Sequence, residues 1–308
     1  MNQQAVERND GGIPPIGDRY RVAGRRLFLH RSGEGGPAVV FLPGANSVGL
    51  DYLKIHEAVA AFTTSVLYDR GGTGWSDRIE LPRTASEVAA ELRSLLSTAG
   101  IDGPYILVAH SLGGAYARRF AQMFPGDVAG LVALESFSED WDAYMPEDLY
   151  LDQTPDAVPG RFQTTLLRVL SRPFYRKMFS AWPAEIRTPL VAGHVDRDWM
   201  VIGAKERSNM TALREELKAG PAFPDVPLIA IAALGSDSGQ RLSLSKKMLG
   251  QLNDSKARLY AAMAESVTNG EYRPLPTARH STIQLDEPDA IIEAIRDVHT
   301  RAAAPPAE

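Results

Sequence analysis

The sequence predicts an α/β protein in which strands alternate with helices and one long helical segment is inserted. Three observations predict this fold class. Short apolar runs typical of buried strands, such as Ala38–Leu42 and Gly130–Leu134, alternate with segments suited to helices. The apolar run Ile106–His110 turns directly through Ser111 into the small residues of a helix start. The alternation then stops over residues 136–224, where no strand-like run occurs.

The first predicted strand of this series, Ala38–Leu42, leads into the short loop Pro43–Asn46. The next, which begins the segment Val66–Asp77, leads into a loop with three glycines, Gly71, Gly72 and Gly74. Glycine adopts positive φ without a steric penalty, so it suits tight loops. The sequence therefore predicts a structural role for this second loop.

Ser111 lies where a predicted strand turns sharply into a helix. A turn of this kind is strained and requires small flanking residues, and Ala109 and Gly113 meet that requirement. The start of a helix also favours developing negative charge, because its backbone N–H groups are unpaired. Ser111 is therefore a candidate nucleophile for attack on a carbonyl. The alternative is that Ser111 only caps the helix, which serine often does.

Two carboxylates follow predicted strands downstream of this turn. Glu135 ends the apolar strand Gly130–Leu134, and a buried carboxylate needs a partner because an unpaired buried charge is costly. Asp237 follows the predicted strand 227–234 and lies in a Gly/Ser-rich loop, where aspartate is common as a turn residue or helix cap. Glu135 is preferred as a functional acid because its burial demands an explanation. Asp237 stays open as the alternative.

Four segments together resemble the α/β-hydrolase fold family. The turn at Ser111 resembles the G-x-S-x-G nucleophile elbow, with Ala109 in place of the first glycine. Pro43–Asn46 resembles the His-Gly-x segment, with proline in place of the histidine, and Val66–Asp77 is similar to the D-x-x-G-x-G-x-S-D loop. Residues 278–288 resemble the loop that carries the catalytic histidine, ahead of a final helix. The resemblance implies a mostly parallel, eight-stranded sheet flanked by helices, with an inserted helical cap.

The resemblance also implies a set of site residues. Ser111 would be the nucleophile and His280 the general base, because a serine hydroxyl is a weak nucleophile until a base takes its proton. The backbone N–H groups of Ala45 and Leu112 would hold the oxyanion. Glu135, at a position where several branches of the family carry an acid, would orient the histidine as the third member of the triad; Asp237, at the position where most members carry it, is the alternative. No cofactor is expected, and the absence of cysteine and of paired histidines argues against a metal site.

The function implied is hydrolysis of a carboxylic ester or lactone. The cap is rich in Trp, Tyr, Phe and Met, and some of these side chains are expected to face Ser111, so the substrate is expected to be hydrophobic. Haloalkane dehalogenases and epoxide hydrolases of this fold use an aspartate nucleophile, so Ser111 argues against both. The alternatives are a C–C bond or amide hydrolase, an acyltransferase, and a small-molecule receptor with little turnover.

The expected organisation is a flexible N-terminal extension (1–18), a core formed by 19–135 and 225–301, a cap over 136–224, and a frayed tail (302–308). A net charge of −5 without basic runs argues against a nucleic-acid partner, and none is expected. The N-terminal segment lacks an apolar stretch, so neither a signal peptide nor a membrane anchor is expected. With no cysteine in the chain, a cytoplasmic location is expected.

Overall fold

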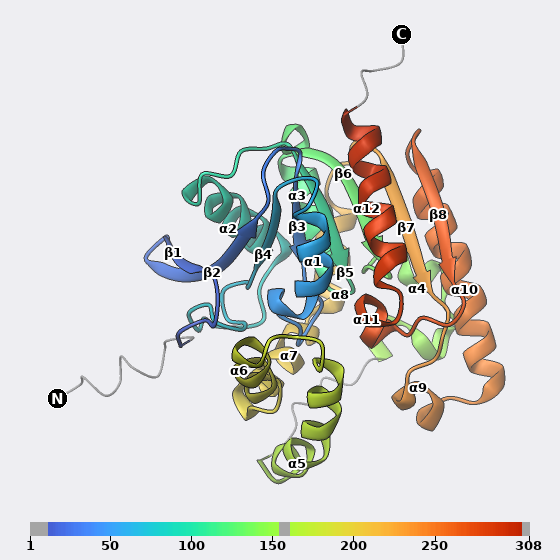
Figure 1. Ribbon diagram of the computed structural model, residues 1–308. Coiled ribbons are helices and arrows are strands. Elements are labelled where there is room, and N and C mark those ends of the chain that lie inside the picture. The colour runs from blue at the N-terminus through green and yellow to red at the C-terminus, as the bar shows by residue number, and fades with distance from the viewer. Residues whose placement is uncertain (1–11, 154–160, 304–308) are drawn as a thin grey trace.

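A single eight-stranded sheet runs through the centre of the protein (Figure 1). The computed structural model describes residues 12–153 and 161–303. The strand order is β1-β2-β4-β3-β5-β6-β7-β8; β2 pairs antiparallel with β1 and β4, and every other pair is parallel. This confirms the predicted mostly parallel, eight-stranded sheet. The strands are β1 (Asp18–Val22), β2 (Arg25–Ser32), β3 (Ala38–Leu42), β4 (Ser65–Tyr68), β5 (Tyr105–His110), β6 (Val128–Leu134), β7 (Leu228–Ala233) and β8 (Gly270–Leu275).

Helices cover both faces of the sheet. On one face α1 packs beside α12, and on the other face α2 packs beside α3, with α10 against β7 and β8 (Figure 1). The helices are α1 (Leu53–Val59), α2 (Ala85–Thr98), α3 (Gly113–Met123), α4 (Trp141–Tyr144), α5 (Arg161–Met178), α6 (Ala184–His194), α7 (Arg197–Arg207), α8 (Met210–Lys218), α9 (Ser238–Ser243), α10 (Lys246–Glu265), α11 (Ile283–Asp286) and α12 (Pro288–Ala303). Short 3-10 helices are η2 (Gly49–Tyr52), η3 (Pro125–Asp127), η4 (Glu147–Leu149), η5 (Leu151–Gln153) and η6 (His280–Thr282).

The central strands are apolar on both faces because both faces are covered. In β3, Val39 and Phe41 join the hydrophobic cluster that contains Ile295 of α12, whereas Val40 joins the cluster that contains Phe120 of α3. Successive side chains of a strand point to opposite faces, so a continuous apolar run is what a strand buried on both sides requires. The carboxyl ends of the parallel strands are therefore held rigidly at one edge of a two-sided core.

Between β6 and β7, the described residues form helices joined by turns and coil, and none of them forms a strand. Helices α5, α6 and α7 lie together at one end of the molecule (Figure 1). Trp182, between α5 and α6, donates its indole N–H to the carbonyl of Leu50 in the core at 2.9 Å. Residues 154–160 of this predicted cap lie outside the described residues.

The predicted bounds of the N-terminal extension and of the C-terminal tail differ slightly from the structure. Asp18, predicted in the N-terminal extension, already pairs with Leu29 as the first residue of β1. Ala302 and Ala303, predicted in the frayed tail, continue α12, because alanine has the highest helix propensity. Residues 1–11 and 304–308, the rest of both predictions, lie outside the described residues. Among the described helices, none has the length and apolar character needed to cross a bilayer.

Candidate active site

The turn between β5 and α3 holds Ser111 in a strained backbone conformation. Ser111 has φ 50°, in the left-handed region of backbone conformation that residues other than glycine rarely adopt. A Cβ on Gly113 would lie 2.1 Å from the carbonyl oxygen of Leu42, so only glycine fits there. The methyl group of Ala109 is completely buried, which shows that the alanine in place of the usual glycine is accommodated. The sharp turn predicted from the sequence is present.

His280 lies beside Ser111, although 169 residues separate them. It begins η6, after β8, and its Nε2 lies 3.0 Å from the Oγ of Ser111. On the other side of the ring, Nδ1 lies 3.2 Å from Oε1 of Glu135. This second contact is within ion-pair distance, but the ring N–H is not aligned for a hydrogen bond. Such contacts often tighten only when substrate binds.

Glu135 is the carboxylate that the structure brings to the histidine ring. It follows β6 with φ 39°, is buried, and accepts a hydrogen bond from the backbone N–H of Ala233 at 3.1 Å. Asp237 instead stands at the start of α9, where its Oδ2 accepts from the N–H of Ser281 at 3.4 Å. Among the contacts of the described residues, none joins Asp237 to the ring of His280.

A buried lysine accompanies Glu135, and the sequence reasoning missed it. Lys256 of α10 is 1% exposed, and its Nζ lies 3.1 Å from Oε1 of Glu135 and donates to the carbonyl of Ala233. A signal was present in the sequence. Leu252, Lys256 and Tyr260 are spaced four residues apart and form one buried stripe of α10. A lysine inside an apolar helical stripe indicates a buried partner of opposite charge.

The charges of the site favour an ionised pair. Burial disfavours the charged form of the His280 ring, but the neighbouring Glu135 outweighs it, so the pKa of His280 is raised above 6.5. Burial likewise tends to raise the pKa of Glu135, yet His280 and Lys256 together hold that pKa below 4.5. The carboxylate is thus charged at neutral pH, and it favours protonation of His280.

A second histidine, His110, supports the loop that carries His280. Its Nε2 lies 3.0 Å from the carbonyl oxygen of His280, which can only accept, so Nε2 carries the proton. Its Nδ1 then accepts from the hydroxyl of Tyr52 at 2.8 Å. Burial and the nearby His280 lower the pKa of His110 to about 3. His110 is therefore neutral and serves as a fixed hydrogen-bonding support.

The two predicted oxyanion donors lie on loops beside Ser111. A Cβ on Gly44, the residue before Ala45, would lie 3.0 Å from the Cβ of Ser111, so this loop passes directly against the serine. Leu112 follows the serine and precedes α3. Within the described part of the chain, the N–H groups of Ala45 and Leu112 have no acceptor. Free N–H groups of this kind suit an oxyanion.

A cavity of about 230 Å³ contains Ser111 and His280. Helix α5 contributes Phe174, Tyr175 and Met178 to its wall, so part of the aromatic and methionine content of the predicted cap faces the serine. Polar groups line the cavity too. His194 of α6 and Asp51 of η2 form a buried pair with Nε2 and Oδ1 2.7 Å apart, and Arg207 lies at the end of α7. The lining is therefore mixed rather than purely apolar.

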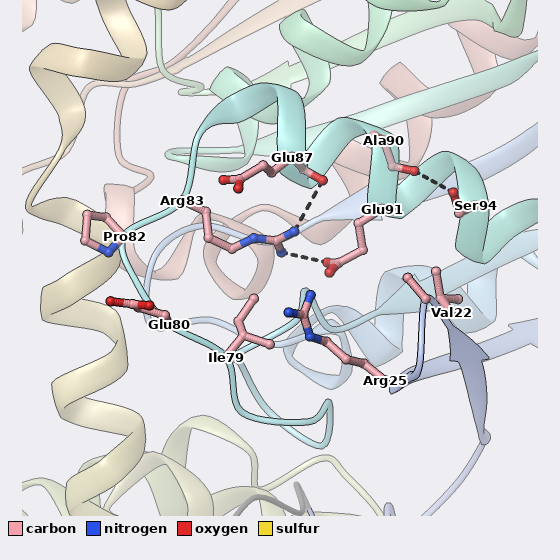
Figure 2. A pocket seen from close by; sticks show the side chains of 11 residues that line it. Val22, Arg25, Ile79, Glu80, Pro82, Arg83, Glu87, Ala90, Glu91 and Ser94 are labelled. Carbon is pink, nitrogen blue, oxygen red and sulfur yellow. Dashed lines mark hydrogen bonds and ion pairs between the residues drawn. The ribbon is translucent and has the colours of Figure 1, made fainter.

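Another cavity, of about 530 Å³, lies beside α2 and does not include these groups (Figure 2). Two of its charged side chains, Arg83 and Glu91, form an ion pair. Arg83 lies 2.9 Å from Glu91 and donates to the carbonyl of Glu87 at 3.2 Å. None of its lining residues belongs to the cavity at Ser111. Although larger, it offers no nucleophile paired with a base, so the smaller cavity is the candidate active site.

Two curated proteins are similar to parts of this chain. An uncharacterized protein of Schizosaccharomyces pombe is 40% identical over 76 residues, which are 25% of this chain and 14% of that protein. An uncharacterized protein of Bacillus subtilis is 29% identical over 127 residues, which are 41% of this chain and 50% of that protein. The matches therefore span no more than half the length of these two curated relatives.

Solved structures resemble nearly the whole chain. A thermophilic esterase from Thermogutta terrifontis has a TM-score of 0.59 at 18% identity, covering 91% of this chain and 98% of that one. A putative acyltransferase from Salmonella enterica has a TM-score of 0.65 at 18% identity, covering 94% and 98%. An epoxide hydrolase has a TM-score of 0.65 at 17% identity, covering 92% and 98%. At these identities, the likeness establishes the fold alone.

The model of the Alpha/beta hydrolase family matches residues 39–294. That range begins in β3 and ends in α12, so it contains Ser111, Glu135 and His280 as well as the segment between β6 and β7. The match agrees with the resemblance found in the motifs and with the sheet topology. This chain therefore belongs to the Alpha/beta hydrolase family.

Proposed function

We propose that this protein is a serine hydrolase that cleaves a carboxylic ester or lactone at Ser111. One observation carries the proposal. The Oγ of Ser111 lies 3.0 Å from Nε2 of His280, whose Nδ1 lies 3.2 Å from Glu135, and the serine opens into a cavity. A nucleophile in contact with a base, which in turn contacts an orienting acid, is the arrangement that acyl transfer requires.

The reaction proceeds through an acyl-enzyme. His280 takes the proton of the Ser111 hydroxyl as Oγ attacks the carbonyl carbon, and the N–H groups of Ala45 and Leu112 stabilise the negative oxygen. The protonated His280 then gives its proton to the leaving alkoxide, and the C–O bond of the ester breaks. In the second half, His280 deprotonates a water molecule that attacks the acyl group. The bond between the acyl carbon and Oγ then breaks, and His280 returns its proton to Oγ, which releases the acid and regenerates Ser111. Glu135 stabilises the imidazolium in both halves.

The size and lining of the cavity favour a substrate whose acyl group is of modest size and partly apolar. Phe174, Tyr175 and Met178 provide apolar contact area opposite the serine. A volume of about 230 Å³ suits a small or medium-sized substrate. An epoxide hydrolase shares this fold, but the residue at the turn here is serine, which suits an acyl-enzyme and not the aspartate ester of that class.

A fluorophosphonate probe tests the proposal. The activated Oγ displaces fluoride and forms a stable phosphonyl ester, so intact mass and peptide mapping are expected to show one adduct, on Ser111. The labelled protein is expected to lose hydrolysis of p-nitrophenyl acetate in proportion to labelling. A folded protein that is neither labelled nor active on this ester would contradict the proposal, and would favour the receptor alternative.

The pH dependence of kcat/KM follows from the shifted pKa of His280. The neutral ring is the base, so kcat/KM is expected to rise with pH and reach half its limit above pH 6.5. The stability that the His280–Glu135 ion pair gives the fold changes with pH in the opposite direction to kcat/KM. A raised histidine pKa adds stability that is complete below pH 6.5 and is lost as pH rises through the folded-state pKa. A rate profile over neutral pH measures the midpoint, and one at or below pH 6.5 would contradict the assignment.

A further inference from the structure

The side chain of Arg70 holds the loop that carries one oxyanion donor. Arg70 follows β4, is 2% exposed, and donates from Nη1 to the carbonyl of Pro43 at 2.6 Å and from Nη2 to the carbonyl of Gly44 at 3.0 Å. The carbonyl of Gly44 belongs to the same peptide unit as the N–H of Ala45. That peptide is planar and trans, so the two groups point in opposite directions. Fixing the carbonyl therefore fixes the direction of the Ala45 N–H.

Glu206, on helix α7 between β6 and β7, completes this arrangement. Its Oε1 accepts from Nε and Nη2 of Arg70 at 2.9 and 2.7 Å, and its Oε2 accepts from the backbone N–H of Asn46 at 3.3 Å. Asn46 has φ 62°, so the loop turns sharply immediately after Ala45. The two side chains thus hold the peptide units on both sides of Ala45, one from the carbonyl side and one from the N–H side.

We propose that Arg70 and Glu206 are a positioning pair that directs the Ala45 N–H at the oxyanion and couples helix α7 to the oxyanion site. The proposal rests on the proposed function. The charged donor at the Gly44 carbonyl also polarises the peptide, which strengthens the opposite N–H as a donor. Oxyanion stabilisation depends on donors placed in advance, and displacements near 1 Å are enough to weaken it.

Stability alone does not account for a pair buried this deeply. Both side chains are at most 3% exposed, and desolvating two charges offsets much of their attraction. Well-packed apolar residues of similar volume often hold a fold equally well. They would not, however, donate to the carbonyls of Pro43 and Gly44 or accept from Asn46. These contacts with the loop are what distinguishes this pair from an apolar replacement.

The double variant Arg70→Met/Glu206→Met tests the pair while avoiding a single uncompensated buried charge. We expect kcat on p-nitrophenyl acetate to fall roughly 10- to 100-fold, less than for outright removal of an oxyanion donor. KM is expected to change less than about threefold, because the contact matters more in the transition state than in the ground state. Labelling by a fluorophosphonate is expected to slow by a similar factor, with the thermal midpoint near that of the wild type.

A matched control uses another ion pair that joins a helix on the sheet to a helix from the segment between β6 and β7. Arg119 of α3 and Glu216 of α8 lie 3.5 Å apart, and Glu216 accepts from the N–H of Ala85 at the start of α2. The variant Arg119→Met/Glu216→Met removes the same residue types without touching the oxyanion loop, so its kcat is expected to stay within about twofold of the wild type.

The possible results separate the two proposals. An active wild type with an equally active Arg70→Met/Glu206→Met variant would overturn the positioning pair alone. The positioning pair would also be wrong if both double variants lost kcat equally, or if the loss appeared only in KM. A wild type that is neither labelled nor active would overturn the proposed function, and this inference with it.

Discussion

Replacing Ser111 with alanine is expected to lower kcat for ester hydrolysis by roughly 10⁶-fold, because the entire covalent route depends on its hydroxyl oxygen. Only the oxyanion donors and substrate binding would then contribute to the rate. Alanine carries a Cβ as serine does, so the strain at φ 50° is unchanged and the fold is expected to persist. Initial rates on p-nitrophenyl acetate, together with the mass of the fluorophosphonate adduct, measure the effect.

Ser94→Ala provides the matched control for this substitution. Ser94 lies on the exposed side of α2, where its hydroxyl donates to the carbonyl of Ala90, so both rate and labelling are expected to be unchanged. Both variants are compared with the wild type by thermal unfolding. If Ser111→Ala keeps more than about one hundredth of the wild-type kcat, another group performs the hydrolysis and the nucleophile assignment is wrong.

The turn at Ser111 was predictable because its cause is local. An apolar strand followed by a serine and small residues specifies a tight bend, and the 2.1 Å approach of a Gly113 Cβ to Leu42 shows why the glycine is required. The central strands were predictable for a related reason, since runs such as Val39–Phe41 are apolar on both faces. The sequence pattern of each feature lies within a few residues, although the contact that requires glycine at 113 comes from β3.

The partners across the site were not predictable because topology brings them together. Lys256 lies 121 residues from Glu135, and Arg70 lies 136 residues from Glu206. A lysine or arginine in the sequence carries no sign of which distant carboxylate it will contact. The same holds for Tyr175, whose position against the cavity depends on how α5 packs. Burial alone favoured Glu135 over Asp237, but the sequence could not show which of the two carboxylates would lie beside the His280 ring.

Replacing Glu135 with glutamine is expected to lower kcat by roughly 10³- to 10⁴-fold, because the imidazolium of His280 loses its counter-charge and the ring its preferred tautomer. The change is also expected to lower the free energy of unfolding by about 3 to 5 kcal/mol, since Lys256 keeps a buried charge without its partner. Rates at saturating substrate measure the first effect. Chemical denaturation at neutral pH measures the second.

The double variant Glu135→Gln/Lys256→Met separates these two effects. Removing the unpaired buried charge is expected to restore much of the lost stability, yet kcat should stay low because His280 still lacks a carboxylate. Asp237→Asn is the matched control, and its kcat is expected to stay within about threefold of the wild type, because Asp237 contacts the N–H of Ser281 and not the ring. A large loss of kcat in Asp237→Asn with little loss in Glu135→Gln would reverse the choice of acid. If instead the double variant recovered kcat along with stability, the role of Glu135 would be to neutralise Lys256 and not to orient His280.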